Sequence, residues 1–350
     1  MEFSIERDEL LQGLHLTQGI VERRTTIPIL ANVLLEASNE GVIISATDQE
    51  VGVRRLCAAD VKNSGAITTA ARKLYEIVRE CPEGPLAIKS LDNNWIAVAS
   101  GKSRFRIVGL DPKEFPAMPA ARGNDPEAKV RIPADLFREI VTRTLFAVSL
   151  DETRLNLSGI FLERPAAGQI RAVATDGHRL SMITRPVEGV GQGEGIILPR
   201  KGVNEISKVI EGSDEDIDLT IGGGIAHTAQ GGVELAMRLV EGEFPDYNQV
   251  VPKKSPRVMT VGIDEFLASL RRGAVVASER NRGVRLQIEN GKMEVSSMNP
   301  DFGEANEEVT VDFDAEPVSI GFNARYLMDV LAVLPGDNQV EMSFNDDVSP

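Results

Sequence analysis

The stretch VATDGHRLSM, residues 173–182, places an aspartate, a glycine, a histidine and an arginine between two apolar runs. Asp176 and His178 could form an acid–base pair or half of a metal site, or the stretch could be a turn that something else binds. Asp and Gly are ordinary turn residues, and a polar turn between two strands is the commonest setting for such a string. The turn is therefore favoured over a catalytic dyad.

Other residues that could carry chemistry are few and far apart. Cys57 and Cys81 are the only cysteines and no two histidines are close in sequence, so neither a zinc cluster nor a disulfide is expected. SGKSRF (100–105) and IGGGIAH (221–227) lack the spacing of phosphate-binding and dinucleotide-binding loops, and they are better interpreted as strand and hairpin-turn segments. No nucleophile accompanies Asp176 and His178. The sequence predicts no catalytic residue, no metal and no cofactor.

Composition describes a globular chain with an acidic balance. It has 350 residues, of which 42% are hydrophobic, so it can bury a sizeable core and should divide into two or three domains. It shows no signal core and no run long enough for a membrane span, which makes the cytoplasm the default location. A net charge of −15 argues against loose adhesion to nucleic acid over the whole surface, but it does not describe local faces.

The most informative feature is internal repetition. FSIERDELLQGL (3–14), VRIPADLFREIV (130–141) and MTVGIDEFLASL (259–270) each read as a short strand, an aspartate that is an N-cap or first-turn anion, and a helix. Each copy continues with strand pairs, then another strand and a second helix. The expected fold is α+β, with three repeated domains of two helices plus antiparallel strands: 1–120, 128–248 and 256–350, the third apparently without its closing strand.

Basic residues recur on the helices. Arg72 and Arg79 lie seven positions apart and so share a helix face, opposite Leu74 and Val78. Lys201 and Lys208 occupy the equivalent places in the second repeat, and Arg24 follows the first helix of the first repeat. The pattern suggests helices that present a basic surface and an acidic sheet side. Such a unit invites closure into a ring whose basic hole admits duplex DNA.

Several motifs, in order along essentially the whole chain, resemble the bacterial DNA polymerase III beta subunit, the sliding clamp family. They are RTTIPIL (24–30), ATDGHRL (174–180), PRKG (199–202), EFPDY (243–247), RGVRL (282–286) and IGFNARYLMDVL (320–331). The resemblance implies a head-to-tail homodimer, a ring of six domains around duplex DNA that is bound without regard to sequence. It also implies a non-catalytic processivity factor that is opened by a clamp loader and tethers the replicative DNA polymerase and other partners.

The resemblance also assigns residues to sites. It implies a pocket between the second and third domains that captures short linear motifs, at Leu157, Thr175, Gly177, His178, Arg179, Leu180, Pro245 and Val250. Its dimer interface corresponds to Phe105 and Ile107 against Val275 and Val276 of the other subunit. The expected DNA-binding residues are Arg24, Arg72, Arg79, Arg154, Lys201 and Lys208. Two alternatives stay open: an interaction scaffold whose ring never threads nucleic acid, and, more remotely, a hydrolase using Asp176 and His178.

Overall fold

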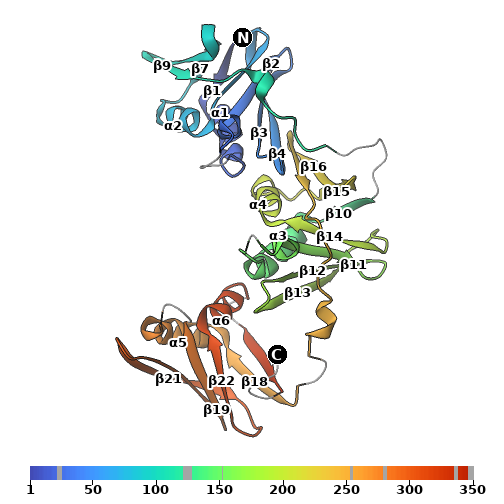
Figure 1. Cartoon of the computed structure of the whole chain (residues 1–350), viewed down its shortest axis with the longest axis vertical. Helices are drawn as coiled ribbons and strands as arrows, with labels where there is room; N and C mark the ends of the chain where they lie inside the picture. The colour runs from blue at the N-terminus through green and yellow to red at the C-terminus, as the bar shows by residue number, and fades with distance from the viewer. Residues whose placement is uncertain are drawn as a thin grey trace. The chain divides into compact units, whose positions relative to one another are not determined.

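The computed structural model describes residues 1–21, 26–120, 128–151, 153–252, 255–278, 282–334 and 338–345. The chain divides into two compact units, Met1–Gly242 and Glu243–Pro350, coloured blue to yellow and orange to red in Figure 1. The first unit holds two copies of the repeated domain and the second unit holds one. The expectation of an α+β fold with three repeated domains is confirmed.

All three domains begin with the same order of elements: a strand, a helix, antiparallel strands and a second helix. Three strands follow the second helix in the first two domains, and one strand follows it in the described part of the third. The first domain contains β1 (Glu2–Glu6), α1 (Arg7–Thr17), β2 (Asn32–Ser38), β3 (Gly41–Thr47), β4 (Val51–Cys57), β5 (Asp60–Asn63), β6 (Gly65–Ala70), α2 (Ala71–Glu80), β7 (Pro85–Ser90), β8 (Trp95–Ser100) and β9 (Ser103–Val108).

The second domain repeats this order with β10 (Ala128–Ile132), α3 (Ala134–Thr144), β11 (Gly159–Arg164), β12 (Gln169–Thr175), β13 (Leu180–Pro186), β14 (Gly193–Pro199), α4 (Arg200–Val209), β15 (Ile217–Gly222), β16 (Ile225–Gln230) and β17 (Val233–Arg238). The third contains β18 (Arg257–Gly262), α5 (Ile263–Val276), β19 (Gly283–Glu289), β20 (Lys292–Asn299), β21 (Gly303–Asp312), β22 (Val318–Asn323), α6 (Ala324–Leu331) and β23 (Gln339–Phe344). Short 3-10 helices are η1 (Pro28–Ala31), η2 (Asp92–Asn94), η3 (Pro112–Glu114), η4 (Leu145–Ala147), η5 (Leu155–Leu157) and η6 (Tyr247–Gln249).

The repeated positions have the same environment in each domain. Leu10, Phe137 and Phe266, one from each first helix, are 0%, 3% and 0% exposed. Each of these helices has its aspartate in the first turn rather than at the N-cap, where it interacts favourably with the helix dipole. The sequence repeat is therefore a repeat of packing as well as of secondary structure.

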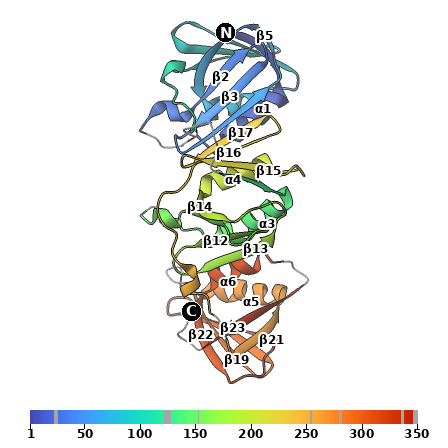
Figure 2. The ribbon, with the colours of Figure 1, turned by 90° about the vertical axis from the view of Figure 1, so that its right-hand side faces the viewer.

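The two domains of the first unit share one eight-stranded sheet, in the order β10-β15-β16-β17-β4-β3-β2-β6 (Figure 2). Its central step joins β17 of the second domain to β4 of the first in antiparallel pairing, with Leu235 opposite Val53. Leu235 is 0% and Val53 2% exposed, so the junction is part of the core. One domain thus continues into the next through hydrogen-bonded backbone.

The remaining sheets belong to single domains. Their orders are β5-β1-β7-β8-β9 in the first domain, β13-β12-β11-β14 in the second and β22-β19-β20-β21-β18-β23 in the third. The glycines of 221–227 form a hairpin turn, as predicted, with Gly222 paired with Ile225. The stretch 100–105, predicted as strand, contains a hairpin turn as well, since Ser100 at the end of β8 pairs with Ser103 at the start of β9. Among the helices of the described residues, none is long and apolar enough to cross a membrane.

Candidate functional site

The ATDGHRL stretch forms a tight turn between β12 and β13, as predicted. Thr175 pairs with Leu180 at the ends of the two strands. Asp176 Oδ1 accepts the backbone N–H of His178 at 2.9 Å and that of Arg179 at 3.0 Å. Gly177 has φ +84°, a left-handed conformation that favours glycine. The aspartate and the glycine are therefore the residues that build this turn.

Arg179 fastens the turn to the body of the second domain. Its Nε donates to Asp176 Oδ2 at 3.1 Å, and its Nη2 donates to the Phe146 carbonyl oxygen at 2.7 Å. The guanidinium also lies 5.3 Å from the centre of the Phe146 ring, within cation–π range. Both Asp176 oxygens are thus engaged in shaping and holding the turn.

Arg154 lies beside the same turn. Its Nε donates to Asp151 Oδ2 at 3.1 Å, and a Cβ built on Gly177 would lie only 2.5 Å from Arg154 Nη1. The sequence assigned Arg154 to DNA, but its observed neighbour is the turn. Nothing local in the sequence links residues 154 and 177, because they approach each other only through the tertiary fold.

The other residues assigned to the pocket are distributed over both units. Leu157 is buried and Leu180 is half-buried in the second domain. In the second unit, Pro245 is exposed and Val250, which follows η6, is 53% exposed.

On α2, Arg72 and Arg79 project to solvent as predicted, with side chains 71% and 54% exposed, while Leu74 and Val78 are buried. Glu76 pairs with Arg72 at 3.0 Å, and Glu80 pairs with Arg79. Hydrogen bonds from Lys73 and then Arg72 hold the pKa of the Glu76 carboxyl below its ordinary value. Arg24 lies outside the described residues.

On α4, the equivalent residues Lys201 and Lys208 lie at the junction between the first two domains. Lys201 Nζ contacts Asp48 Oδ2 and donates to the Ile20 carbonyl oxygen at 2.8 Å. Lys208 Nζ donates to Glu205 Oε1 at 2.7 Å. Both face a groove of about 870 Å³, lined by Gly19, Asp48, Glu50, Val51, Ser149, Leu150, Asp151, Leu155, Ser158, Pro199, Arg200, Lys201, Asn204, Glu205 and Lys208.

Arg200, the first residue of α4, is a cation that the sequence reasoning missed. It lines the groove, is partly exposed, and makes no side-chain hydrogen bond or ion pair within the described residues. The PRKG motif could have pointed to it, since Arg200 stands directly before Lys201.

The four residues assigned to the dimer interface differ in exposure. Val275, near the end of α5, is 80% exposed, and Phe105 and Val276 are half-buried. Ile107 is only 9% exposed, because its side chain lies in the core of the first unit. Ile107 is therefore primarily a core residue within its own chain.

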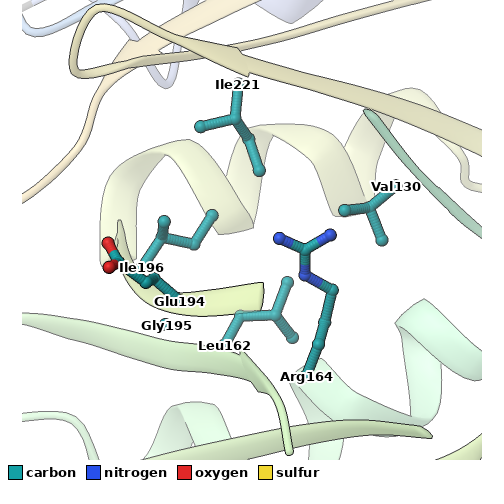
Figure 3. Close-up of a pocket in the computed structure, with 7 residues that line it drawn as sticks. All are labelled: Val130, Leu162, Arg164, Glu194, Gly195, Ile196 and Ile221. Atoms are coloured by element: carbon teal, nitrogen blue, oxygen red, sulfur yellow. The ribbon is translucent and has the colours of Figure 1, made fainter. Parts of the chain in front are cut away.

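A separate cavity of about 260 Å³ lies in the second domain, and none of these residues lines it. It is lined by Val130, Leu162, Arg164, Glu194, Gly195, Ile196 and Ile221. Figure 3 shows the Arg164 guanidinium pointing into it between Val130 and Ile221. Within the described ranges that guanidinium makes no hydrogen bond or ion pair.

Comparisons with known proteins agree along the whole chain. Residues 1–119 match the N-terminal domain of the DNA polymerase III beta subunit, residues 131–246 its central domain and residues 248–350 its C-terminal domain. The beta sliding clamp of Caulobacter vibrioides is 36% identical over 100% of this chain and 95% of its own length. That of Escherichia coli K12 is 32% identical over 100% and 94%.

Solved structures agree in the same way. The Caulobacter crescentus DNA polymerase sliding clamp matches with a TM-score of 0.91 at 35% identity, covering 100% of this chain and 94% of that one. The Pseudomonas aeruginosa clamp, solved bound to griselimycin, matches with a TM-score of 0.90 at 33% identity and the same coverage.

Three like domains, of which the first two share a sheet and carry cationic helix faces, define a sliding clamp. The chain belongs to the DNA polymerase III beta subunit family. Its role is that of a non-catalytic processivity factor, so the hydrolase interpretation of Asp176 and His178 is wrong. Membership implies partnership with DNA and a DNA polymerase, and a dimer.

Proposed function

We propose that two copies of this chain close head to tail into a ring around duplex DNA, in the cytoplasm. The ring is opened by a clamp loader, and it tethers the replicative polymerase and other proteins through their short peptide motifs. Each copy contributes three domains, 1–120, 128–248 and 256–350. The observation that carries the proposal is the β4–β17 pairing, because it joins one clamp domain to the next through continuous backbone hydrogen bonds.

The strands equivalent to this pair are available for a second junction of the same kind. β9 is the first domain's counterpart of β17, and on its outer edge it has no partner among the described strands. β21 is the third domain's counterpart of β4, and its segment 303–309 pairs with β20 alone in the described part of the chain. A β9–β21 pairing between two copies is heterologous and closes after two such contacts.

Charge supports the same pairing. If the β4–β17 register is carried over, exposed Arg106 lies opposite exposed Glu304, and Phe105 lies opposite Ala305. We assign Phe105, Ile107, Val275 and Val276 to this interface, with Val275 as the residue that has most surface to bury.

DNA binding is assigned to Arg24, Arg72, Arg79, Arg154, Lys201 and Lys208. The described members each have a carboxylate partner, which weakens their attraction for phosphate. Weak attraction that does not depend on base sequence suits a ring that must slide. Arg72 and Arg79, the more exposed pair, should contribute most.

Peptide binding is assigned to Leu157, Thr175, Gly177, His178, Arg179, Leu180, Pro245 and Val250. Arg154, which is also assigned to DNA, joins this set because it lies against Gly177. A rigid turn with apolar neighbours and cationic side chains suits a short peptide with apolar anchors.

Encirclement is tested by topology. The clamp is loaded with its clamp loader on nicked circular DNA, freed of unbound protein, and the DNA is then cut once with a restriction enzyme. Loss of the clamp from cut DNA but not from uncut DNA is expected. Equal retention on both would exclude a ring and favour the scaffold that never threads DNA.

A further inference from the structure

Two large apolar side chains are exposed next to the turn between β20 and β21. Met298 is 74% exposed and Phe302 is 77% exposed. Single exposed apolar residues are common on protein surfaces, but neighbouring ones of this size often mark a contact surface. Asp301 N–H donates to Asn299 Oδ1 at 3.0 Å, and the Phe302 N–H donates to the Asn299 carbonyl oxygen at 3.2 Å. The turn is therefore held in shape without help from the two apolar side chains.

A second exposed apolar pair lies on the first domain. Trp95 at the start of β8 and Val108 at the end of β9 are cross-strand neighbours, 40% and 56% exposed. They stand at one end of the outer strand β9, the strand that we assign to ring closure. Cross-strand neighbours have side chains on the same face, so this pair forms a continuous apolar surface.

The junction within the chain indicates what such positions touch. The β8–β9 and β16–β17 hairpins have the same register, which makes Val108 equivalent to Arg238. In the chain, the Arg238 N–H donates to the Glu50 carbonyl oxygen at 2.8 Å, and Arg238 Nε donates to the Gln49 carbonyl oxygen at 3.2 Å. The end of β17 thus lies against the β3–β4 turn.

The β20–β21 turn is the third domain's counterpart of that β3–β4 turn. Thr47 pairs with Gly52, and Met298 pairs with Glu304 at the same place in the third domain. Counting from these pairs, Phe302 occupies the position of Glu50, directly before the strand. Where the junction within the chain brings together Arg238 and Glu50, a junction of the same register between two copies brings together Val108 and Phe302.

From this we infer that Phe302 and Met298 of one copy pack on Val108 and Trp95 of a second copy, forming an apolar clasp at each ring-closing junction. The inference rests on the proposed head-to-tail dimer and adds residues and a chemistry to it. Burial of these side chains stabilises the closed ring through the hydrophobic effect. The two kinds of junction then differ in character, because the junction within the chain has polar contacts at the corresponding place.

The chain contains one tryptophan, so intrinsic tryptophan fluorescence reports on Trp95 alone. Wild type and Phe302→Ala are diluted from micromolar to low nanomolar concentration, and both emission and sedimentation are followed. Wild-type emission should move to longer wavelength as the dimer dissociates, because Trp95 becomes more exposed to water. Phe302→Ala should weaken each junction about tenfold, and hence the two-junction ring about 100-fold.

Matched variants separate this effect from general loss of apolar surface. Val258→Ala changes a side chain on β18 in the same unit that is 40% exposed, and it should leave the dimer unchanged. Phe302→Leu should recover most of the dimer affinity, and a far-ultraviolet circular dichroism melt verifies that each variant is folded.

The outcomes distinguish the clasp from the ring itself. The clasp is overturned if folded Phe302→Ala dimerises as tightly as wild type and Trp95 emission does not change when the dimer dissociates. That result would leave the head-to-tail dimer intact. A wild type that is monomeric at every concentration overturns both.

Discussion

The Lys201 ammonium of α4 and the Asp48 carboxylate of the β3–β4 turn form an ion pair that links the first two clamp domains. The Asp48 side chain is 7% exposed, and its Oδ1 also accepts the N–H groups of Glu50 at 2.9 Å and Val51 at 2.7 Å. Lys201 is more exposed, at 33%. A charge held this far from water needs its partner, so Lys201 has a structural role besides any attraction for DNA.

Removing the lysine should therefore destabilise the first unit. Lys201→Met leaves the Asp48 carboxylate buried with only its backbone donors. We expect the free energy of unfolding to fall by about 1–3 kcal/mol, the usual cost of a buried polar group that has lost a partner. Urea denaturation followed by circular dichroism measures this change.

Two further variants test the cause. Lys73→Met removes a lysine whose side chain is 60% exposed, and it should change stability little. Lys201→Met combined with Asp48→Asn should recover part of the loss, because no unpaired charge remains. Equal stability of Lys201→Met and wild type would show that the ion pair does not support the junction.

The exposed arginines of α2 should act mainly on DNA. Replacing Arg72 and Arg79 with glutamine should shorten clamp retention on circular DNA, more strongly at low salt, because fewer counterions are released from the phosphates. A plot of the logarithm of the binding constant against the logarithm of salt concentration should become less steep by about one unit for each lost phosphate contact.

Lys62→Gln with Lys89→Gln is the matched control, since it removes two positive charges from strands β5 and β7 rather than from a helix. Its retention should resemble wild type. If both double variants behaved alike at every ionic strength, the effect would follow net charge and the helix face would have no special part in DNA binding.

The fold was predictable from the sequence where the signal is local. Ile5, Ile132 and Val261 alternate with polar residues in the three first strands, and all three are buried. The face of α2 followed from helical spacing in the same way. An Asp-Gly pair between two apolar runs was enough to predict the turn at Asp176 and Gly177.

The sequence could not show contacts that depend on the tertiary fold. Lys201 has the spacing of a solvent-facing cation, yet Asp48 of the first domain engages it at the junction. The packing of Arg154 on Gly177 joins two loops with no shared pattern. Ile107 lies on an outer strand, and only the packing of the sheet against the helices determines that its side chain points into the core.

The turn at Gly177 gives a prediction about partners. The double variant His178→Ala, Leu180→Ala should bind a polymerase-derived peptide more weakly by about 2 kcal/mol or more, because an apolar anchor contact is lost. This corresponds to an increase in Kd of about 30-fold. Titration of a fluorescently labelled peptide measures the change, and sedimentation should show an unchanged dimer.

Leu56→Ala serves as the comparison for peptide binding. Leu56 is 44% exposed on β4 of the first domain and is not among the residues assigned to the peptide. This variant should bind as wild type does. Equal affinity of all three proteins for the peptide would remove the ATDGHRL turn from the binding surface.

Cys57 gives a prediction at alkaline pH. Its thiol is fully buried on β4, and burial, followed by the nearby Glu9 carboxylate, raises its pKa to about 12. An unfolded cysteine ionises near pH 8.5, roughly, so the folded state holds this proton more tightly. Stability linked to Cys57 is therefore complete below about pH 8.5 and is lost as pH rises toward the folded pKa, by about 3 kcal/mol near pH 10.5. Urea denaturation of wild type and Cys57→Ala between pH 7.5 and 10.5, roughly, should give a shallower pH dependence for the variant. Comparing slopes cancels the constant cost of the cavity that alanine leaves. Parallel slopes for the two proteins would mean that the thiol ionises as easily in the fold as in the unfolded chain.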